Sequence, residues 1–166
     1  MATDATTVEK IKKEFLKPFV QGVMTTLETM ASMTPSIKGI ELVASDRFSG
    51  DVSAIMGLAG QGGEGFVGIT FNANLAKTVV SKVLHLEEEE LDDNDINDGV
   101  GELINMIAGS AKNALLGTPY CFQLALPNVI TGRGHEVAYP RNADCWTSTL
   151  EVAGTEFHLH VAYAKK

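Results

Sequence analysis

Two polar side chains, Glu102 and Asn105, stand three residues apart in a stretch with helical periodicity. At a rise of 1.5 Å per residue, their Cα atoms lie about 4.5 Å apart along the helix axis. The Asn105 amide has no useful pKa, so it cannot act as a general acid or base. It can donate and accept hydrogen bonds at once, which suits it to hold a water molecule in line with a phosphorus atom. Glu102 could orient the same water, or pair with a cation on a partner and so aim Asn105.

The sequence offers no second acid, nucleophile or phosphate-binding loop to work with this pair. The glycine-rich stretch Gly60 to Gly65 lacks the Lys-Ser/Thr of a P-loop. His158 and His160 have no third ligand at a metal-binding spacing, and the acidic stretch from Asp93 lacks the Gly and Glu that an EF-hand requires. We therefore expect this chain to bind no metal or other cofactor, and the pair to complete the active site of another protein.

The element that must position the pair is a helix predicted from Asp95 to Leu116. At 100° per residue, its apolar residues cluster on one side and its polar and small residues within roughly 40° of a line on the other. The apolar side comprises Ile96, Val100, Leu103, Ile107, Ala111 and Ala114. The opposite line comprises Asp98, Glu102, Asn105, Gly109 and Lys112, with Gly101 at its edge. Glycine within a helix costs about 1 kcal/mol relative to alanine, and often lets another backbone approach. We interpret the line as a docking face, with an ordinary solvated face as the alternative.

A second long helix is predicted from Thr7 to Met33, with Pro18 inside it as a kink or as its true start. A shorter helix is predicted from Ala73 to Leu86. Strands are predicted in six further segments: Ile37 to Ala44, Asp51 to Leu58, Phe66 to Phe71, Tyr120 to Leu126, Cys145 to Val152 and Glu156 to Tyr163. A polar turn, Ser45 to Gly50, joins the first two, a further β-like segment lies near His135 to Ala138, and Ala153-Gly154-Thr155 predicts a hairpin.

The two long helices resemble one another under a shift of 84 residues, which lays Met33-Thr34-Pro35 on Gly117-Thr118-Pro119. Each helix is followed by about three strands, which predicts that the chain consists of two α-β-β-β halves. The predicted fold class is α+β, with long helices packed on a largely antiparallel or mixed β-sheet.

Composition limits the classes of partner. The 166 residues suit a single domain, 1–166, and a formal net charge of −8 argues against nucleic-acid binding and against docking on anionic membranes. The sequence shows no signal peptide and no membrane-spanning stretch, which predicts a cytoplasmic protein. Cys121 and Cys145 are expected to be buried thiols, with one disulfide between them as the alternative.

The segment from Asp98 to Gly109 resembles the signature of the CheC/CheX/FliY chemotaxis phosphatases. That signature is an acid or Ser, three residues, Glu, two residues, Asn, and a Pro some two dozen residues on, where Pro127 fits. The resemblance extends to Gly65–Phe71 and Ala125–Gly132 and covers roughly residues 8 to 163. The whole chain is thus identified as a single CheX-like phosphatase domain.

This resemblance implies an enzyme that hastens hydrolysis of the aspartyl phosphate on a CheY-like response regulator. Glu102 and Asn105 would be catalytic, with Glu102 pairing with a Lys of the regulator, and the regulator would supply Mg²⁺. The rest of the line, Asp98, Gly101, Gly109 and Lys112, would bind the regulator. Under the 84-residue shift Glu102 falls on Pro18, and no E-x-x-N occurs between residues 7 and 33. One site per chain and a homodimer, as in CheX, are therefore expected.

Two alternatives stay open at this point. One is a non-catalytic binding module of the same fold that docks on a response regulator or a flagellar-switch protein. The other is a purely structural dimer, which leaves the Gly and Asn residues of the docking face unexplained.

Overall fold

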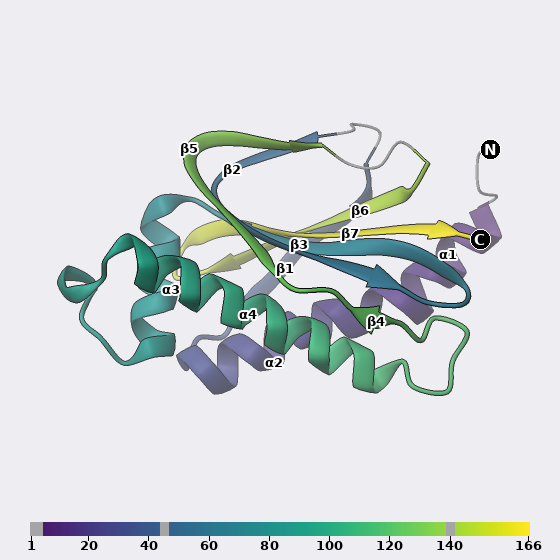
Figure 1. Ribbon diagram of the computed structural model, residues 1–166, viewed down its shortest axis with the longest axis horizontal. Coiled ribbons are helices and arrows are strands. Elements are labelled where there is room, and N and C mark those ends of the chain that lie inside the picture. Colours follow the sequence, from purple (N-terminus) through teal and green to yellow (C-terminus); the bar gives the residue numbers. More distant parts are fainter. Residues whose placement is uncertain (1–4, 44–46, 139–141) are drawn as a thin grey trace.

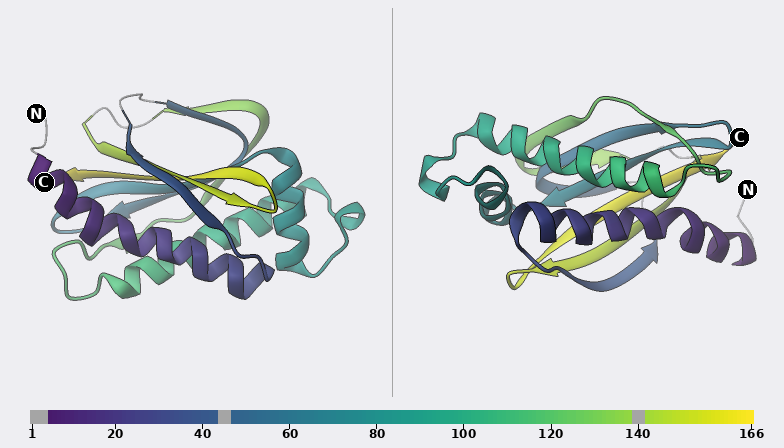
Figure 2. Two further views of the ribbon diagram at one scale, coloured as in Figure 1. Left: turned by 180° about the vertical axis from the view of Figure 1, so that it is seen from behind. Right: turned by 90° about the horizontal axis from the view of Figure 1, so that it is seen from below.

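The computed structural model describes residues 5–43, 47–138 and 142–166, and its helices cover one face of a seven-stranded sheet (Figures 1 and 2). The helices are α1 (Ala5–Ile11), η1 (Lys12–Leu16), α2 (Lys17–Ala31), α3 (Ala73–Leu84), η2 (Glu88–Glu90) and α4 (Asp93–Ala114). The strands are β1 (Ser36–Leu42), β2 (Arg47–Ala59), β3 (Gly63–Phe71), β4 (Gln123–Leu124), β5 (Asn128–Ala138), β6 (Asp144–Val152) and β7 (Thr155–Lys165). Every strand pair is antiparallel, which confirms the predicted α+β class.

The first long helix is continuous from Ala5 to Ala31 through α1, η1 and α2, as predicted. The η1 segment is π-helical and ends just before Pro18, whose missing N–H removes one helical hydrogen bond. The helix stops at Ser32, which adopts a left-handed conformation with φ of 51°, and Met33 N–H closes the end on the Leu27 carbonyl. Pro18 therefore marks an irregular turn inside one helix.

The order of the strands is symmetric about the pair formed by β7 and β3. The sheet runs β1-β6-β7-β3-β2, and β5 and β4 both pair with the far side of β2. The first strand of each half thus pairs with a strand of the other half: β1 pairs with β6, and β5 pairs with β2. This exchange fits the two predicted α-β-β-β halves. The 84-residue shift aligns the two long helices but not the strands that follow them. The connection from α4 to β5 is longer than that from α2 to β1.

Three strand predictions need correction. The segment from Tyr120 to Leu126 forms a strand only at Gln123–Leu124, because the turn after α4 bends the chain through Cys121 N–H to the Thr118 carbonyl. The β-like segment near His135 begins much earlier, at Asn128.

The predicted turn before Asp51 is also partly wrong. Arg47 to Gly50 belong to β2, where they pair with the end of β5 and Arg47 contacts Glu136 at 3.2 Å. Ala44, Ser45 and Asp46 of the predicted strand and turn lie outside the described residues.

The hairpin between β6 and β7 is confirmed. Ala153 and Gly154 have φ of 51° and 75°, the positive values that a two-residue type I′ turn requires. Most of the core lies between the helices and the sheet, around Phe15, Phe19 and Ile107, and a smaller cluster of Phe48, Phe66, Cys145 and Ala162 covers part of the other face. Among the described residues, no helix is long and apolar enough to cross a membrane.

Candidate functional site

The start of α4 is set by reciprocal hydrogen bonds between Asp92 and Asp95. Asp95 N–H donates to the Asp92 carboxylate at 2.8 Å, and Asp92 N–H donates to the Asp95 carboxylate at 3.0 Å. This capping box satisfies two N–H groups at the helix start, where negative charge is also favoured by the helix dipole. It fixes the residue at which α4 begins.

The other side of α4 packs on α2, α3 and the sheet, and glycines make two of these contacts possible. A Cβ on Gly22 of α2 would lie 3.0 Å from the Ile107 carbonyl oxygen. A Cβ on Gly99 would lie 2.6 Å from a methyl of Val80 on α3. These glycines serve packing inside the molecule, and they hold α4 firmly in its orientation.

The predicted helix orientation is correct at all but one apolar position. Ile96, Val100, Leu103, Ile107 and Ala111 are buried. Ala114 is exposed, because α4 ends there and the chain turns away.

The polar line lies on the open face of α4. Asp98, Glu102 and Asn105 are exposed, and a Cβ on Gly109 would meet nothing within 4 Å. The Nζ of Lys112, at the end of the line, donates to the Gln123 side chain at 3.0 Å. Three of the predicted site residues are therefore exposed in one line, and the half-buried Gly109 and Lys112 continue it.

Gly101 lies apart from this open surface. It is buried, and a Cβ there would lie 3.5 Å from a methyl of Val129 on β5. The edge of the predicted docking face is thus covered by a strand of the same chain.

The segment from Gln123 to Thr131 runs antiparallel to α4 along that edge (Figure 1). Gln123 accepts from Lys112, Val129 adjoins Gly101, and the Thr131 hydroxyl donates to the Asn97 side chain at 2.6 Å. The residues midway along this segment must therefore lie beside the middle of α4. Among them is Pro127, the last element of the sequence signature.

A β-bulge interrupts the segment at this point. Leu124 pairs with Leu58 and Asn128 pairs with Ile55, so three residues, 125–127, stand opposite two residues of β2. One extra residue on one strand is a bulge, which kinks the strand and re-aims its side chains. Proline is tolerated in a bulge because its missing N–H breaks no regular pair.

The bulge turns Leu126 out of the molecule. Phe122 is buried and Leu124 packs against the core, so regular alternation would also direct Leu126 inward. Instead its side chain is 85% exposed. Sequence reasoning did not select this residue, although an apolar residue directly before a proline in a strand is a signal of a bulge.

The histidines on the opposite face of the sheet have a structural role. His160 is buried, stacks on Phe48 with ring centroids 3.8 Å apart, and lies within 3.1 Å of the Thr147 hydroxyl. Burial, together with the smaller effect of the neighbouring His158, lowers the pKa of His160 to about 3. In the described part of the chain, no three His, Cys, Asp or Glu side chains are grouped to hold a metal ion.

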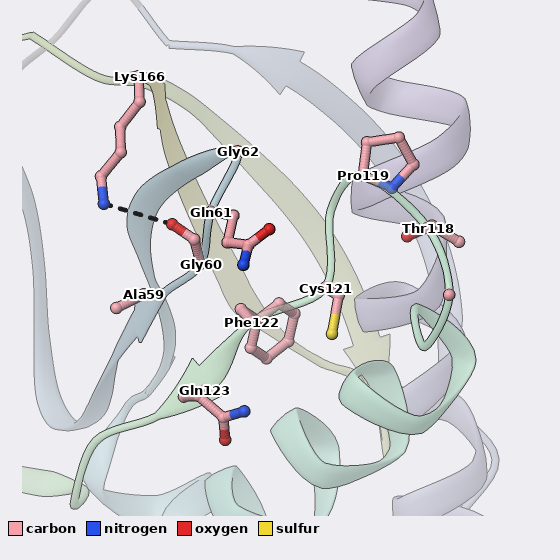
Figure 3. A pocket seen from close by; sticks show the side chains of 11 residues that line it. Ala59, Gly60, Gln61, Gly62, Thr118, Pro119, Cys121, Phe122, Gln123 and Lys166 are labelled. Carbon is pink, nitrogen blue, oxygen red and sulfur yellow. Dashed lines mark hydrogen bonds between the residues drawn. The ribbon is translucent and has the colours of Figure 1, made fainter.

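A pocket lies beyond the C-terminal end of α4 (Figure 3). Its volume is about 920 Å³, and its walls are the turn at 59–62, the segment 117–123 and Lys166, whose Nζ donates to the Gly60 carbonyl. It contains no residue of the predicted site and no acid–base pair. It borders the line only through Gln123, the partner of Lys112. The exposed face of α4 is the better candidate site, because a helix that completes a partner's active site has no need of a cavity of its own.

Residues 52–151 match a family described as chemotaxis phosphatase CheX. The chemotaxis protein CheX of Desulfovibrio desulfuricans is 31% identical, with 92% of this chain and 99% of that chain covered and a TM-score of 0.82. CheX of Vibrio vulnificus is 27% identical, with 90% and 99% covered and a TM-score of 0.82. CheX of Borrelia burgdorferi, solved in a complex with CheY, BeF3 and Mg²⁺, shares the fold at 22% identity, with 90% and 97% covered and a TM-score of 0.74. Among curated protein sequences, none matches.

Proposed function

The chain belongs to the CheX family of chemotaxis phosphatases, and from this premise we propose that it hydrolyses the aspartyl phosphate of a CheY-like response regulator. The observation that carries the proposal is the exposure of Glu102 and Asn105 on one turn of a firmly packed helix. Both side chains can reach into another protein's active site without any rearrangement of this chain.

In the proposed reaction, α4 docks over the phosphorylated aspartate and the Asn105 amide holds a water molecule in line with the phosphorus. The water oxygen bonds to phosphorus as the bond to the aspartate oxygen breaks, which yields inorganic phosphate and a free carboxylate. Asn105 takes no proton and acts by orientation alone, which can supply a large part of a rate enhancement. Glu102 pairs with a lysine of the regulator and so fixes the position of Asn105.

The remaining exposed residues of the line complete the docking surface. Asp98 offers a negative charge on one side of the pair, and Gly109 leaves room for a close approach on the other. The Mg²⁺ of the reaction belongs to the regulator, whose acidic pocket suits such an ion. The complex of the Borrelia burgdorferi CheX with CheY, BeF3 and Mg²⁺ supports a partner of this kind.

Such a substrate implies a cytoplasmic protein, and we propose that it works as a homodimer with one site in each chain. The exposed edge strand β1 supports self-association, since Ile37 and Leu42 are both about half exposed on it.

The test is the decay of phosphate on response regulators of the same genome, with Asn105→Ala compared with wild type. The rate at saturating regulator should fall at least tenfold, about 1.4 kcal/mol of transition-state stabilisation, with little change in affinity. Asn105→Asp should be as slow or slower, because its charge repels the phosphoryl group. Asn113→Ala, an exposed asparagine on the same helix outside the line, is the matched control. Wild-type rates for Asn105→Ala would favour the non-catalytic binding module.

A further inference from the structure

Leu126 is the most exposed of the large apolar side chains described, and its exposure is built into the strand. Its side chain would point into the core if β4 and β5 continued without the extra residue. The extra residue therefore places on the surface a leucine that a regular strand would bury. A single exposed leucine is common on protein surfaces, but one that is held rigidly along the edge of a docking face offers a partner an apolar contact that is already ordered.

The backbone around Leu126 is fixed on both sides. The preceding Ala125 N–H donates to the Gly57 carbonyl at 3.0 Å, and Asn128 is paired with Ile55 in the sheet. The following Pro127 has a restricted φ. A side chain presented by so rigid a segment loses little conformational freedom on binding, which favours its use as an anchor.

Leu126 belongs to the segment that runs along the helix of the proposed catalytic pair. This segment contacts α4 on both sides of Leu126, at Lys112 through Gln123 and at Gly101 through Val129. On the other flank of the line, Met106 is 42% exposed. The line that carries Glu102 and Asn105 thus lies between Met106 on one side and the segment of Leu126 on the other.

We propose that Leu126 is the apolar anchor of the docking surface and inserts into an apolar depression beside the phosphorylation site of the response regulator. This inference rests on the proposed function. Polar and charged residues near the reacting atoms must recur in every regulator, since the chemistry requires them. An apolar contact at the rim can differ between regulators, so Leu126 selects which of them is bound.

The experiment measures the affinity of Leu126→Ala and of wild type for response regulators activated with BeF3 and Mg²⁺. Such regulators carry no phosphoryl group that can be hydrolysed during the measurement. The affinity of Leu126→Ala should be at least tenfold lower, whereas Leu126→Met should stay within threefold of wild type. Leu116→Ala, at a side chain 60% exposed beyond the end of α4, should change affinity less than twofold. Since Leu126 and Leu116 are both exposed, all three variants should have the melting temperature of wild type. The rate at saturating phosphorylated regulator should be unchanged in Leu126→Ala.

The outcomes separate this inference from the proposed function. Equal affinities of Leu126→Ala and wild type would overturn the anchor, even if wild type dephosphorylates the regulator. Weaker binding by Leu126→Ala, together with no phosphatase activity in wild type, would uphold the anchor and overturn the proposed function. If Leu126→Ala dissociates a dimer without changing affinity for the regulator, the occupant is a second copy of this chain and the proposal is wrong. If wild type binds no activated regulator, both proposals fail.

Discussion

Replacing Gly109 with alanine should make the protein more stable and a poorer partner. The added Cβ meets nothing within 4 Å, so the change introduces no clash within the chain. Alanine is favoured over glycine inside a helix by about 1 kcal/mol. For a chain of this size, 1 kcal/mol raises the melting temperature by about 2–4 °C.

The same methyl group should weaken docking, because Gly109 lies one turn beyond Asn105 on the open face of α4. If a regulator's backbone approaches this face closely, the methyl group holds it away from the proposed catalytic pair. We expect affinity for a BeF3-activated regulator to fall about fivefold, which corresponds to about 1 kcal/mol. Thermal melts and binding measurements on the same samples test both effects.

The control is Gly99→Ala on the same helix. Its Cβ would lie 2.6 Å from a methyl of the fully buried Val80, so overpacking of about 1–3 kcal/mol should lower the melting temperature. A Gly109→Ala variant that is stabilised but binds the regulator as tightly as wild type would refute the interpretation of Gly109 as a docking feature. A variant that is not stabilised would refute the open geometry itself.

The remaining predictions concern the ion pair, acid stability and assembly. Glu102→Ala should lower both affinity for the regulator and the rate at saturation, since the pair with a partner lysine serves both; an effect on only one of them would separate these roles. The pKa of His160 is about 3 in the folded protein against about 6.5 unfolded, so the unfolded chain binds the extra proton and stability falls as pH drops from 6.5 towards 3, by up to about 1.4 kcal/mol per pH unit from this group. Denaturant unfolding at several pH values in this range should show that the free energy of unfolding depends less steeply on pH in His160→Gln than in wild type. An equally steep dependence in the two proteins would contradict the assignment to His160. Light scattering at micromolar concentration should give a dimer, and a mass near the 17.7 kDa of one chain would exclude it.

The sequence predicts those features that depend on neighbours along the chain. The period of α4, its acidic start and the turn at Ala153-Gly154 all follow from residues a few positions apart. The orientation of Glu102 and Asn105 towards solvent was predicted in the same way, because one apolar face determines the opposite one.

Features that depend on distant pairing could not be predicted in this way. The sequence of β1 does not show that its partner is β6 rather than β2, since the same alternation suits either neighbour. The bulge at Leu126 exists only because Asn128 and Leu124 have a common partner strand in β2. The placement of Gly101 against Val129 likewise depends on where β5 lies, so the burial of Gly101 could not be predicted from the helix alone.

The exchange of first strands between the two halves also sets the order in which the chain can fold. Strand β1 emerges early from the ribosome, but its partner β6 is made only after α4 and β5. At ordinary rates of synthesis of about 5–20 residues per second, β1 waits several seconds as an unpaired strand that carries Ile37 and Leu42. Contacts of such long sequence separation slow folding and leave strand edges open to aggregation. The first helix with the β2–β3 hairpin can form during this interval, whereas closure of the sheet must follow synthesis of β6 and β7.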